Sequence, residues 1–319
     1  MSRIIITLGF FDGVHKGHQF LLCELVNKAN LLHAEPVVIT YNQCSKPTKF
    51  ASLLQEKNCF LNNDHCDYTV LSEPKQRIEK IKKIGINTID LLDFTDIQNM
   101  AAEEFLKSVL VQKYHPLAIL IGYDTRFGFN RSGDVQFLYN HSEKYNYEVY
   151  QIPPYQMEQH LISSTLIRNT LKSGEVHLAH KYLGYYYSLS GVVQHGKKMG
   201  TKIGFPTMNL KVNFPQKLVP HAGIYFTCTR IKDKFYFSGT NIGYAPTLNT
   251  ENKIRIETHL LDFSQDMYNQ EIEIFFLERM RAEIRFPAWE NLAQQIKEDM
   301  EQIKVKSLQY GLLAPELFL

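Results

Sequence analysis

The stretch from Ile4 to His18, IIITLGFFDGVHKGH, predicts a buried strand, a tight turn and the start of a helix. Its first five residues form a compact, mostly β-branched run, and apolar residues recur at helical spacing from Leu21 onward. Similar apolar runs alternate with helical patterns further along; the expected strands cover residues 37–40, 88–92, 117–121 and 149–152, and one expected helix covers 101–114. This alternation predicts an α/β domain with a parallel, doubly wound sheet that binds ligands at the carboxyl ends of its strands.

The pattern changes after Gly184, where β-rich segments separated by turn residues follow one another. These segments predict a closed, mostly antiparallel β-barrel, and they cover 188–194, 224–231, 234–238, 253–261 and 271–276. A C-terminal helix is expected after Pro287, with one apolar face made of Leu292, Ile296, Met300 and Ile303. We therefore expect two domains, residues 1–184 and residues 185–319, with the boundary near 174–184.

Charge and composition exclude several classes of protein. The chain has 319 residues, and 35 Lys and Arg against 33 Asp and Glu leave a formal net charge of +2. This near-neutral balance argues against a protein that binds nucleic acid through a broad basic face. No signal peptide is recognisable, and no apolar run approaches the about 18 residues of a membrane span. We expect a cytoplasmic protein with no membrane, nucleic-acid or obligate protein partner.

The five cysteines form no CxxC pair and are expected to be reduced thiols. Three of them lie in a polar stretch, residues 42–72, that is expected to be a long loop. Zinc is a minor alternative there, because the spacing matches no finger or ribbon; the residues concerned are Cys44, Cys59, His65 and Cys66.

The turn after the first strand has the composition of a phosphate-binding loop. Gly9, Gly13 and Gly17 permit tight turns and a close approach of backbone amides to a ligand. The helix that begins there brings partial positive charge, and His15 and His18 share one of its faces. Two imidazoles can donate hydrogen bonds to phosphate oxygens and stabilise developing charge. A glycine-rich turn with two solvated histidines is the structural alternative, and a metal site is disfavoured because no third ligand follows at a suitable spacing.

A second group of motifs falls in the barrel half. The stretch GVVQHGKKMGTKIGFPTMNL, residues 191–210, has glycines at 196, 200 and 204 that suggest a flexible flap. Thr207 and Asn209 supply oxygen atoms, which a magnesium–nucleotide complex prefers. Glu257 lies in a strand with alternating apolar residues and is a candidate base for a hydroxyl nucleophile. A surface or ion-paired glutamate is the alternative, and no Walker motif occurs.

The N-terminal motifs resemble those of the nucleotidylyltransferase superfamily, whose HxGH signature corresponds to His15-Lys16-Gly17-His18. A second match, ISSTLIR over 162–168, resembles the motif that completes that site. The resemblance implies a Rossmann-like domain with His15, His18 and Arg168 in catalysis. It also implies a flavin-nucleotide loop at 122–128 that contains Asp124. The residues it assigns to nucleotide binding are Gly9, Phe11, Asp12, Gly13, Gly17, Ser163, Ser164 and Thr165.

The barrel motifs resemble a riboflavin kinase domain, through GFPTMN, NIGYAPT, ETHLLDF and MRAEIRF. In this order the two halves look like the bifunctional bacterial riboflavin kinase/FAD synthetase family. That family phosphorylates riboflavin to FMN with ATP and then adenylylates FMN to FAD with release of pyrophosphate. The resemblance implies that Glu257 activates the riboflavin hydroxyl and that Arg281 lies near the flavin. It also implies that Thr207 and Asn209 position Mg²⁺ and ATP, with Gly196, Gly200, Gly204 and Pro206 near the nucleotide.

Four departures from the family pattern leave alternatives open. A proline- and histidine-containing turn is replaced at 40–44, the junction lacks a basic residue at 185–186, and Met208 and Thr125 replace the usual residues. One alternative is therefore an FAD synthetase whose kinase-like domain only binds flavin. A non-catalytic flavin sensor and an aminoacyl-tRNA synthetase-like protein are the others. The intact Glu257, His15 and His18 argue against the sensor, and the absence of a basic tRNA-binding face argues against the synthetase.

Overall fold

The computed structural model describes residues 3–42, 69–195, 204–245, 253–284, 286 and 288–310. It divides into two compact units, one through Ser164 and the other from Thr165 onward. Each unit has its own sheet and its own hydrophobic core.

The first unit contains the predicted parallel sheet, with strands in the order β3-β2-β1-β4-β5. All four neighbouring pairs are parallel. The strands are β1 (Ile4–Leu8), β2 (Glu35–Asn42), β3 (Thr88–Asp93), β4 (Ala118–Gly122) and β5 (Glu148–Ile152), and a short hairpin, β6 (Gln156–Met157) and β7 (His160–Leu161), follows them. The sheet confirms the α/β prediction, and its strands correspond to the five predicted apolar runs.

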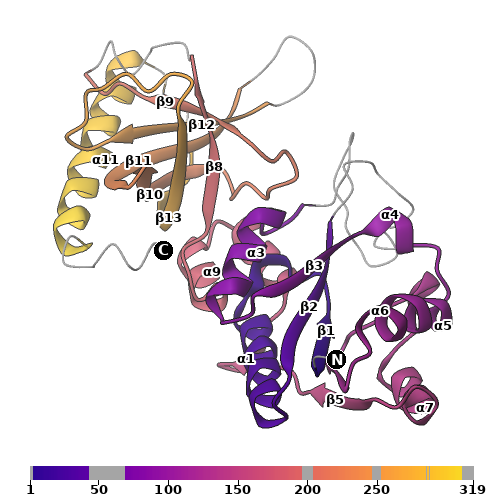
Figure 1. Ribbon diagram of the computed structural model, residues 1–319. Helices are drawn as coiled ribbons and strands as arrows, with labels where there is room; N and C mark the ends of the chain where they lie inside the picture. Colours follow the sequence, from indigo (N-terminus) through magenta and orange to yellow (C-terminus); the bar gives the residue numbers. More distant parts are fainter. Residues whose placement is uncertain are drawn as a thin grey trace. The chain divides into compact units, whose positions relative to one another are not determined.

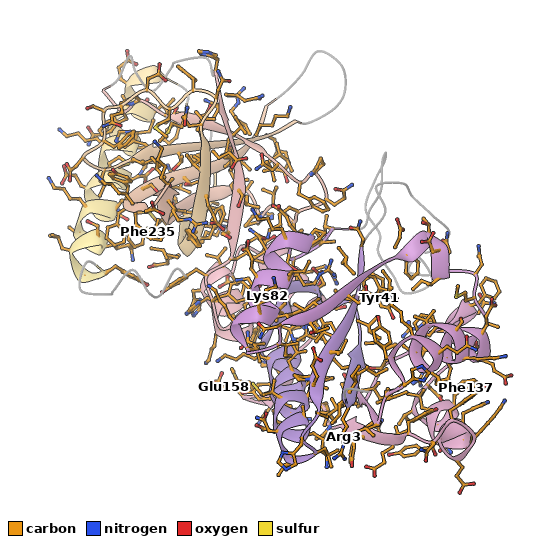
Figure 2. The ribbon with its side chains drawn as sticks, in the orientation of Figure 1. Arg3, Tyr41, Lys82, Phe137, Glu158 and Phe235 are labelled. Carbon is orange, nitrogen blue, oxygen red and sulfur yellow. The ribbon has the colours of Figure 1, made fainter. Side chains whose placement is uncertain are left out.

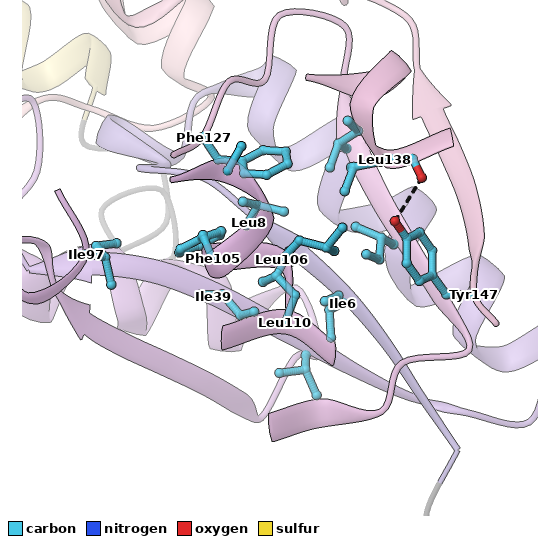
Figure 3. Close-up of a cluster of buried hydrophobic side chains, with 14 of the residues drawn as sticks. Ile6, Leu8, Ile39, Ile97, Phe105, Leu106, Leu110, Phe127, Leu138 and Tyr147 are labelled. Atoms are coloured by element: carbon cyan, nitrogen blue, oxygen red, sulfur yellow. Dashed lines mark hydrogen bonds between the residues drawn. The ribbon is translucent and has the colours of Figure 1, made fainter. Parts of the chain in front are cut away.

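Helices cover both faces of this sheet (Figure 1). On one face lie α1 (Lys16–Leu31) and α3 (Pro74–Lys83), which pack on a core that contains Ile5, Leu25 and Ile81. The other face carries the π-helical segment η2 (Phe105–Val111) and α7 (Val135–Tyr145), packed on the core shown in Figure 3. The remaining short elements of this unit are η1 (Asp12–Val14), α4 (Phe94–Ile97), α5 (Ala102–Glu104), α6 (Gln112–Tyr114) and η3 (Phe129–Arg131).

Alternation along β1 explains why both faces are buried. Ile5 belongs to the core under α1, whereas Ile6 and Leu8 belong to the core under η2 and α7. The second core is closed at its end by Tyr147, whose hydroxyl donates a hydrogen bond of 2.8 Å to the carbonyl of Leu138 (Figure 3). A sheet buried on both faces leaves only its edges and strand ends for ligands.

The second unit contains the predicted closed barrel, which has six strands in the order β10-β11-β12-β9-β8-β13. Every pairing found between neighbouring strands is antiparallel. The strands are β8 (Ser188–Gln194), β9 (Met208–Val212), β10 (Gly223–Ile231), β11 (Lys234–Ala245), β12 (Lys253–Leu260) and β13 (Glu271–Arg281). β9 was not among the strands predicted from the sequence, because its five residues were included in the glycine-rich motif.

The C-terminal helix α11 (Trp289–Tyr310) packs on the outside of the barrel, in yellow beside β11 in Figure 1. Gly239 on β11 allows this close packing, because a Cβ atom there would lie 2.5 Å from Cδ1 of Ile303. Phe226, Leu277, Met300 and Ile303 form part of the core between helix and barrel. The predicted apolar face of the helix is therefore its packing face; the labelled Phe235 in Figure 2 belongs to the periphery of the same cluster.

Two short helices, α8 (Ser164–Lys172) and α9 (Val176–Leu183), lie at the start of the second unit. Arg279 of the barrel donates hydrogen bonds to the carbonyls of Ser173 (3.4 Å) and Ala222 (2.7 Å), and the amide of His221 donates to Leu171 (3.0 Å). These contacts explain why the structural division falls at the start of α8, ahead of the boundary at 184/185 expected from the sequence. That expected domain boundary stays a prediction.

Candidate active sites

The sheet has a topological switch point between β1 and β4. The chain runs from β1 outward to β2 and β3 and then returns to β4 on the other side of β1. In doubly wound sheets the loops that leave such a pair of strands diverge and form a ligand crevice. Here those loops are the segment from Gly9 to His15 and the turn after Gly122 that contains the exposed Asp124. Both predicted phosphate and flavin-nucleotide loops therefore lie at the sheet edge where a ligand is expected.

His15 and His18 stack on each other at the start of α1. Their ring centroids lie 3.6 Å apart, and the planes differ by 18°. His15 is buried and also caps the helix, because its Nδ1 accepts a hydrogen bond of 3.3 Å from the backbone N–H of His18. In a neutral ring this arrangement places the proton on Nε2, which can then donate to a phosphate oxygen.

The backbone of this loop is unusual for its residue types. Phe11 has φ 50°, Gly13 φ 79° and Val14 φ 38°. Left-handed conformations suit glycine but are unfavourable for aromatic and especially β-branched residues, and each costs about 1–3 kcal/mol. Tertiary contacts from Leu71 and Ser72 hold the loop in this shape.

The structure brings the two N-terminal motifs together. Oγ of Ser164 donates a hydrogen bond of 3.0 Å to the carbonyl of Asp12, across 152 positions of sequence. The carbonyl of Ile162 lies 3.2 Å from the place a Cβ of Gly17 would occupy. Ser163 precedes the helix start and Thr165 is exposed in the first turn of α8, while Arg168 follows Ser164 by four residues on that helix, in the second unit.

The Asp12 carboxylate accepts hydrogen bonds from the backbone of a neighbouring segment, at Leu71 and Ser72. Both carboxylate oxygens accept from the backbone N–H of Leu71, at 2.9 and 3.0 Å, and Oδ1 also accepts from the N–H of Ser72 at 3.0 Å. The side chain is buried. These contacts assign Asp12 a part in shaping the loop, and its expected direct contact with a nucleotide stays a prediction.

In the barrel, register places a row of polar residues across four strands. Glu257 on β12 lies opposite Asn241 on β11 and opposite Asn209 on β9, and Asn209 lies opposite Gln194 on β8. Residues directly opposite in antiparallel pairs project from the same face of the sheet. Oδ1 of Asn241 is buried and has no hydrogen-bond partner among the residues that the structure describes. A buried, unpartnered acceptor beside a carboxylate indicates a place for a polar ligand group.

Asn241 and Glu257 of this row line a cavity of about 320 Å³ between the barrel wall and α11. Its walls are largely apolar, with contributions from Phe205, Ile224, Phe286, Leu292, Ile296, Met300 and Ile303. Its polar groups include Thr207, Asn241, Glu257 and Arg281. The guanidinium of Arg255 lies 3.7 Å from the carboxylate of Glu257. Size and lining are typical of a pocket for a small organic ligand.

Arg281 is held in place by the C-terminal helix. Its Nε donates to Oδ1 of Asp299 at 2.9 Å, and its Nη2 donates to Oδ2 at 2.5 Å. The Asp299 side chain is 7% exposed and also accepts from Gln295. Such a two-point pair fixes the plane of the guanidinium. Sequence reasoning missed Asp299, because a single aspartate on an amphipathic helix carries no pattern that identifies its partner.

A second cavity of about 210 Å³ lies on the other side of the Pro206–Thr207–Met208 segment. Thr207 lines both cavities, so the two compartments meet at its position. The carbonyl of Pro206 accepts a hydrogen bond of 2.8 Å from Nδ1 of His259, which anchors this segment to β12. Val193, Leu260, Met267 and Tyr268 supply apolar lining, and Ser264, Gln265 and Asp266 supply polar groups.

Several predicted positions lie outside the described residues. They are Gly196 and Gly200 of the expected flap and the four candidate zinc ligands, Cys44, Cys59, His65 and Cys66. Gly204 is described and has φ 85°, a conformation that favours glycine. Within the described ranges, no group of three or more His, Cys, Asp or Glu is arranged to hold a metal ion.

Comparison with protein families matches both halves of the chain. A model described as FAD synthetase matches residues 1–166, and a model described as riboflavin kinase matches residues 183–306. The chain belongs to the bifunctional riboflavin kinase/FMN adenylyltransferase family. Because both halves match, it is an enzyme with a riboflavin kinase half and an FMN adenylyltransferase half, and the bifunctional interpretation is favoured over the single-activity alternative.

Family members similar to this chain along its length include proteins from two distant bacteria. The Haemophilus influenzae bifunctional riboflavin kinase/FMN adenylyltransferase is 32% identical, over 94% of this chain and 92% of that protein. The Listeria monocytogenes enzyme of the same name is 29% identical, over 94% and 91%. A solved structure named a macrolide-efflux protein, from Streptococcus pneumoniae, has a TM-score of 0.82 and 30% identity over 95% of this chain and 94% of its own. In the described part of this chain, no helix is both long and apolar enough to cross a membrane.

Proposed function

We propose that the two family reactions occur at the two sites described above, with Glu257 as the base for riboflavin and the His15–His18 pair as the phosphate site for adenylylation. The register that aligns Glu257 with Asn209 and Asn241 carries this proposal, because Glu257 and Asn241 also line a largely apolar cavity. An apolar slot with a carboxylate at its end suits a flavin whose hydroxyl must be deprotonated.

In the kinase half, the larger cavity takes the isoalloxazine ring and the smaller one takes ATP. Because Thr207 lines both cavities, the terminal phosphate of ATP and the riboflavin 5′-hydroxyl meet near it. Glu257 accepts the hydroxyl proton as the oxygen bonds to the γ-phosphorus, and the bond to the departing ADP breaks. Alignment and charge stabilisation account for most of the rate in such a transfer.

The oxygen-rich donor set beside Glu257 suits Mg²⁺. Thr207 and Asn209 offer a hydroxyl and an amide oxygen near the row that contains Glu257 and the unpartnered Oδ1 of Asn241. Hard oxygen donors of this kind are the usual protein ligands of Mg²⁺, which supplies charge neutralisation on the ATP phosphates. Thr207 and Asn209 would hold the ion together with those phosphates.

In the adenylyltransferase half, a phosphate oxygen of FMN bonds to the α-phosphorus of ATP and pyrophosphate leaves. Nε2 of His15, the ring of His18 and the first amides of α1 donate to the phosphates as charge develops on them. Asp124 follows β4 and lies at the same sheet edge, where it contacts the flavin nucleotide bound in the crevice. The role of Arg168 on the polyphosphate rests on the resemblance of its motif.

The substrates proposed are small molecules: riboflavin, FMN and ATP, with FAD as the final product. We assign the enzyme to the cytoplasm and to no obligate protein or nucleic-acid partner, in line with its near-neutral charge. Cys23 and Cys228 are free thiols, as expected for a reducing compartment. Burial raises the pKa of the Cys228 thiol to about 12, which keeps it protonated and unreactive.

Two separate assays test the proposal. Riboflavin with Mg²⁺ and ATP should give FMN and then FAD, and FMN with Mg²⁺ and ATP should give FAD and pyrophosphate. FAD from FMN without any product from riboflavin would leave only the adenylyltransferase and reject the kinase assignment. No turnover in either assay would favour a flavin sensor.

We expect Asp299→Asn to weaken riboflavin binding, because the neutral amide cannot form the charged two-point pair that orients Arg281. Loss of one charge-assisted hydrogen bond corresponds to about 10-fold or more in the KM for riboflavin. Steady-state kinetics with riboflavin measure this, and FMN adenylylation should be unchanged. Glu298→Gln, an exposed neighbour on the same helix, is the matched control; an unchanged KM in Asp299→Asn would refute the role of the pair.

We expect Gly17→Ala to reduce FAD formation from FMN about 10-fold or more, because its Cβ would lie 3.2 Å from the His15 ring and 3.2 Å from the Ile162 carbonyl. The protein should not lose stability on account of helix propensity, since alanine is favoured over glycine in a helix by about 1 kcal/mol. FAD synthesis and Tm measured together separate these effects. Cys23→Ala, at an exposed position of α1, should leave both as in the wild type.

A further inference from the structure

The segment from Val70 to Arg77 supports the phosphate loop, although neither the family motifs nor the predicted site residues include it. It supplies the backbone amides that bind Asp12, the hydroxyl of Ser72 and the guanidinium of Arg77. All three contacts reach residues between Phe10 and Gly13. In this segment, the side chains of Ser72 and Arg77 contact the loop.

The guanidinium of Arg77 connects the ends of two strands by hydrogen bonds. Arg77 is only 1% exposed, and its side chain is the largest fully buried one among the described residues. Nη1 donates a hydrogen bond of 2.5 Å to the carbonyl of Phe10, and Nη2 donates one of 3.1 Å to the carbonyl of Tyr41. Phe10 lies two residues after the end of β1, and Tyr41, labelled in Figure 2, is the last residue but one of β2. One side chain thus fixes the exit points of both strands.

Ser72 fixes the middle of the loop. Its Oγ accepts a hydrogen bond of 2.8 Å from the N–H of Gly13 and donates one of 3.3 Å to the Asp12 carboxylate. Ser72 is buried, as is Asp12. The hydroxyl therefore links the acidic side chain to the backbone of the following residue, across 59 and 60 positions of sequence.

The loop requires such support because of its backbone conformation. Phe11 and Val14, on either side of Gly13, both have left-handed φ values. Unfavourable conformations of this kind persist where the surrounding structure over-determines them. The position of His15, and with it the cap of α1, follows directly from the path of these residues.

We propose that Ser72 and Arg77 are positioning residues for FMN adenylylation, which hold the loop in the shape that aims His15 and His18 at the phosphates. This inference rests on the proposed function of that site. Both residues are buried, and both act through Phe10, Asp12 and Gly13.

The test compares Ser72→Ala, Arg77→Met and Arg77→Lys in the full-length protein. We expect kcat for FMN adenylylation to fall by about 10-fold in Ser72→Ala and by about 100-fold in Arg77→Met, because the loop no longer positions its groups. The KM for ATP should change much less. Arg77→Lys keeps the charge and one donor and should recover part of the loss. Riboflavin phosphorylation, which uses the other half of the chain, should stay at the wild-type rate in all three.

Matched controls remove the same groups from exposed positions. Lys82→Met removes a cation from the same helix, α3, and Ser108→Ala removes a hydroxyl from η2. Both should adenylylate FMN at the wild-type rate. Hydrogen exchange of the peptide from Gly9 to His15 supplies a second measurement, and it should accelerate in Ser72→Ala while peptides from β1 and β4 keep their protection.

Each outcome decides the question. Wild-type kcat in Ser72→Ala and Arg77→Met would overturn the positioning role, provided that the wild-type protein makes FAD from FMN. Loss of protection throughout the sheet together with loss of activity would show a general stabilising role instead, and would overturn the proposal as well. Failure of the wild-type protein to make FAD would reject the proposed function itself.

Discussion

Glu257→Gln should reduce FMN formation from riboflavin by about 10²–10⁴-fold, the range typical for removal of a general base. Glutamine has the shape of glutamate and can stay in the row between Asn209 and Asn241, but its amide does not accept the hydroxyl proton. The flavin cavity is unchanged, so the loss should appear in kcat and leave the KM for riboflavin nearly as it is. Product analysis after incubation with riboflavin and ATP measures it.

The same variant carries its own control for folding, because FAD formation from supplied FMN should continue at the wild-type rate. Glu271→Gln, an exposed glutamate on β13 outside both cavities, should phosphorylate riboflavin normally. Equal loss of both activities in Glu257→Gln would contradict the division of labour between the halves.

The reverse pattern is expected for the histidine pair. His15→Asn combined with His18→Ala should lower FAD formation from FMN by about 10²–10³-fold, because the donors that stabilise charge on the phosphates are gone. Asparagine is chosen at position 15 because it also caps helices well, so that α1 keeps an N-cap. FMN should then accumulate from riboflavin and ATP, as followed by chromatography of the flavins.

A matched substitution tests whether this loss is specific. His115→Asn replaces an exposed histidine in the same unit with φ 43°, a conformation that asparagine tolerates. It should leave both activities intact. Normal FAD formation in the His15→Asn/His18→Ala variant would exclude the pair from the chemistry.

Local patterns predicted most of the architecture. Compact apolar runs identified the five parallel strands, and alternation with turn residues identified the barrel, since periods of this kind follow directly from helix and strand geometry. β9 was missed because a strand of five residues inside a glycine-rich motif has little room for a period of its own. The domain boundary depends on which unit α8 and α9 pack against, and a linear pattern carries no information about that choice.

The site was predictable as far as its residues lie in continuous motifs. His15, His18 and Glu257 stand in such strings, and the structure places them at a sheet edge and a cavity floor. The residues that orient the site do not lie in such continuous motifs. Asp299 reaches Arg281 from a helix 18 positions away, and Ser72 reaches Gly13 across 59. Hydrogen bonds between distant segments leave no periodic trace in a single sequence, so they had to be found in the structure.

The most direct test of two separate sites on one chain is a mixing experiment. Glu257→Gln alone and His15→Asn/His18→Ala alone should each fail to convert riboflavin to FAD with ATP. Mixed in equal amounts they should make FAD, because FMN released by the second variant is adenylylated by the first. A mixture that accumulates neither FMN nor FAD would contradict the account.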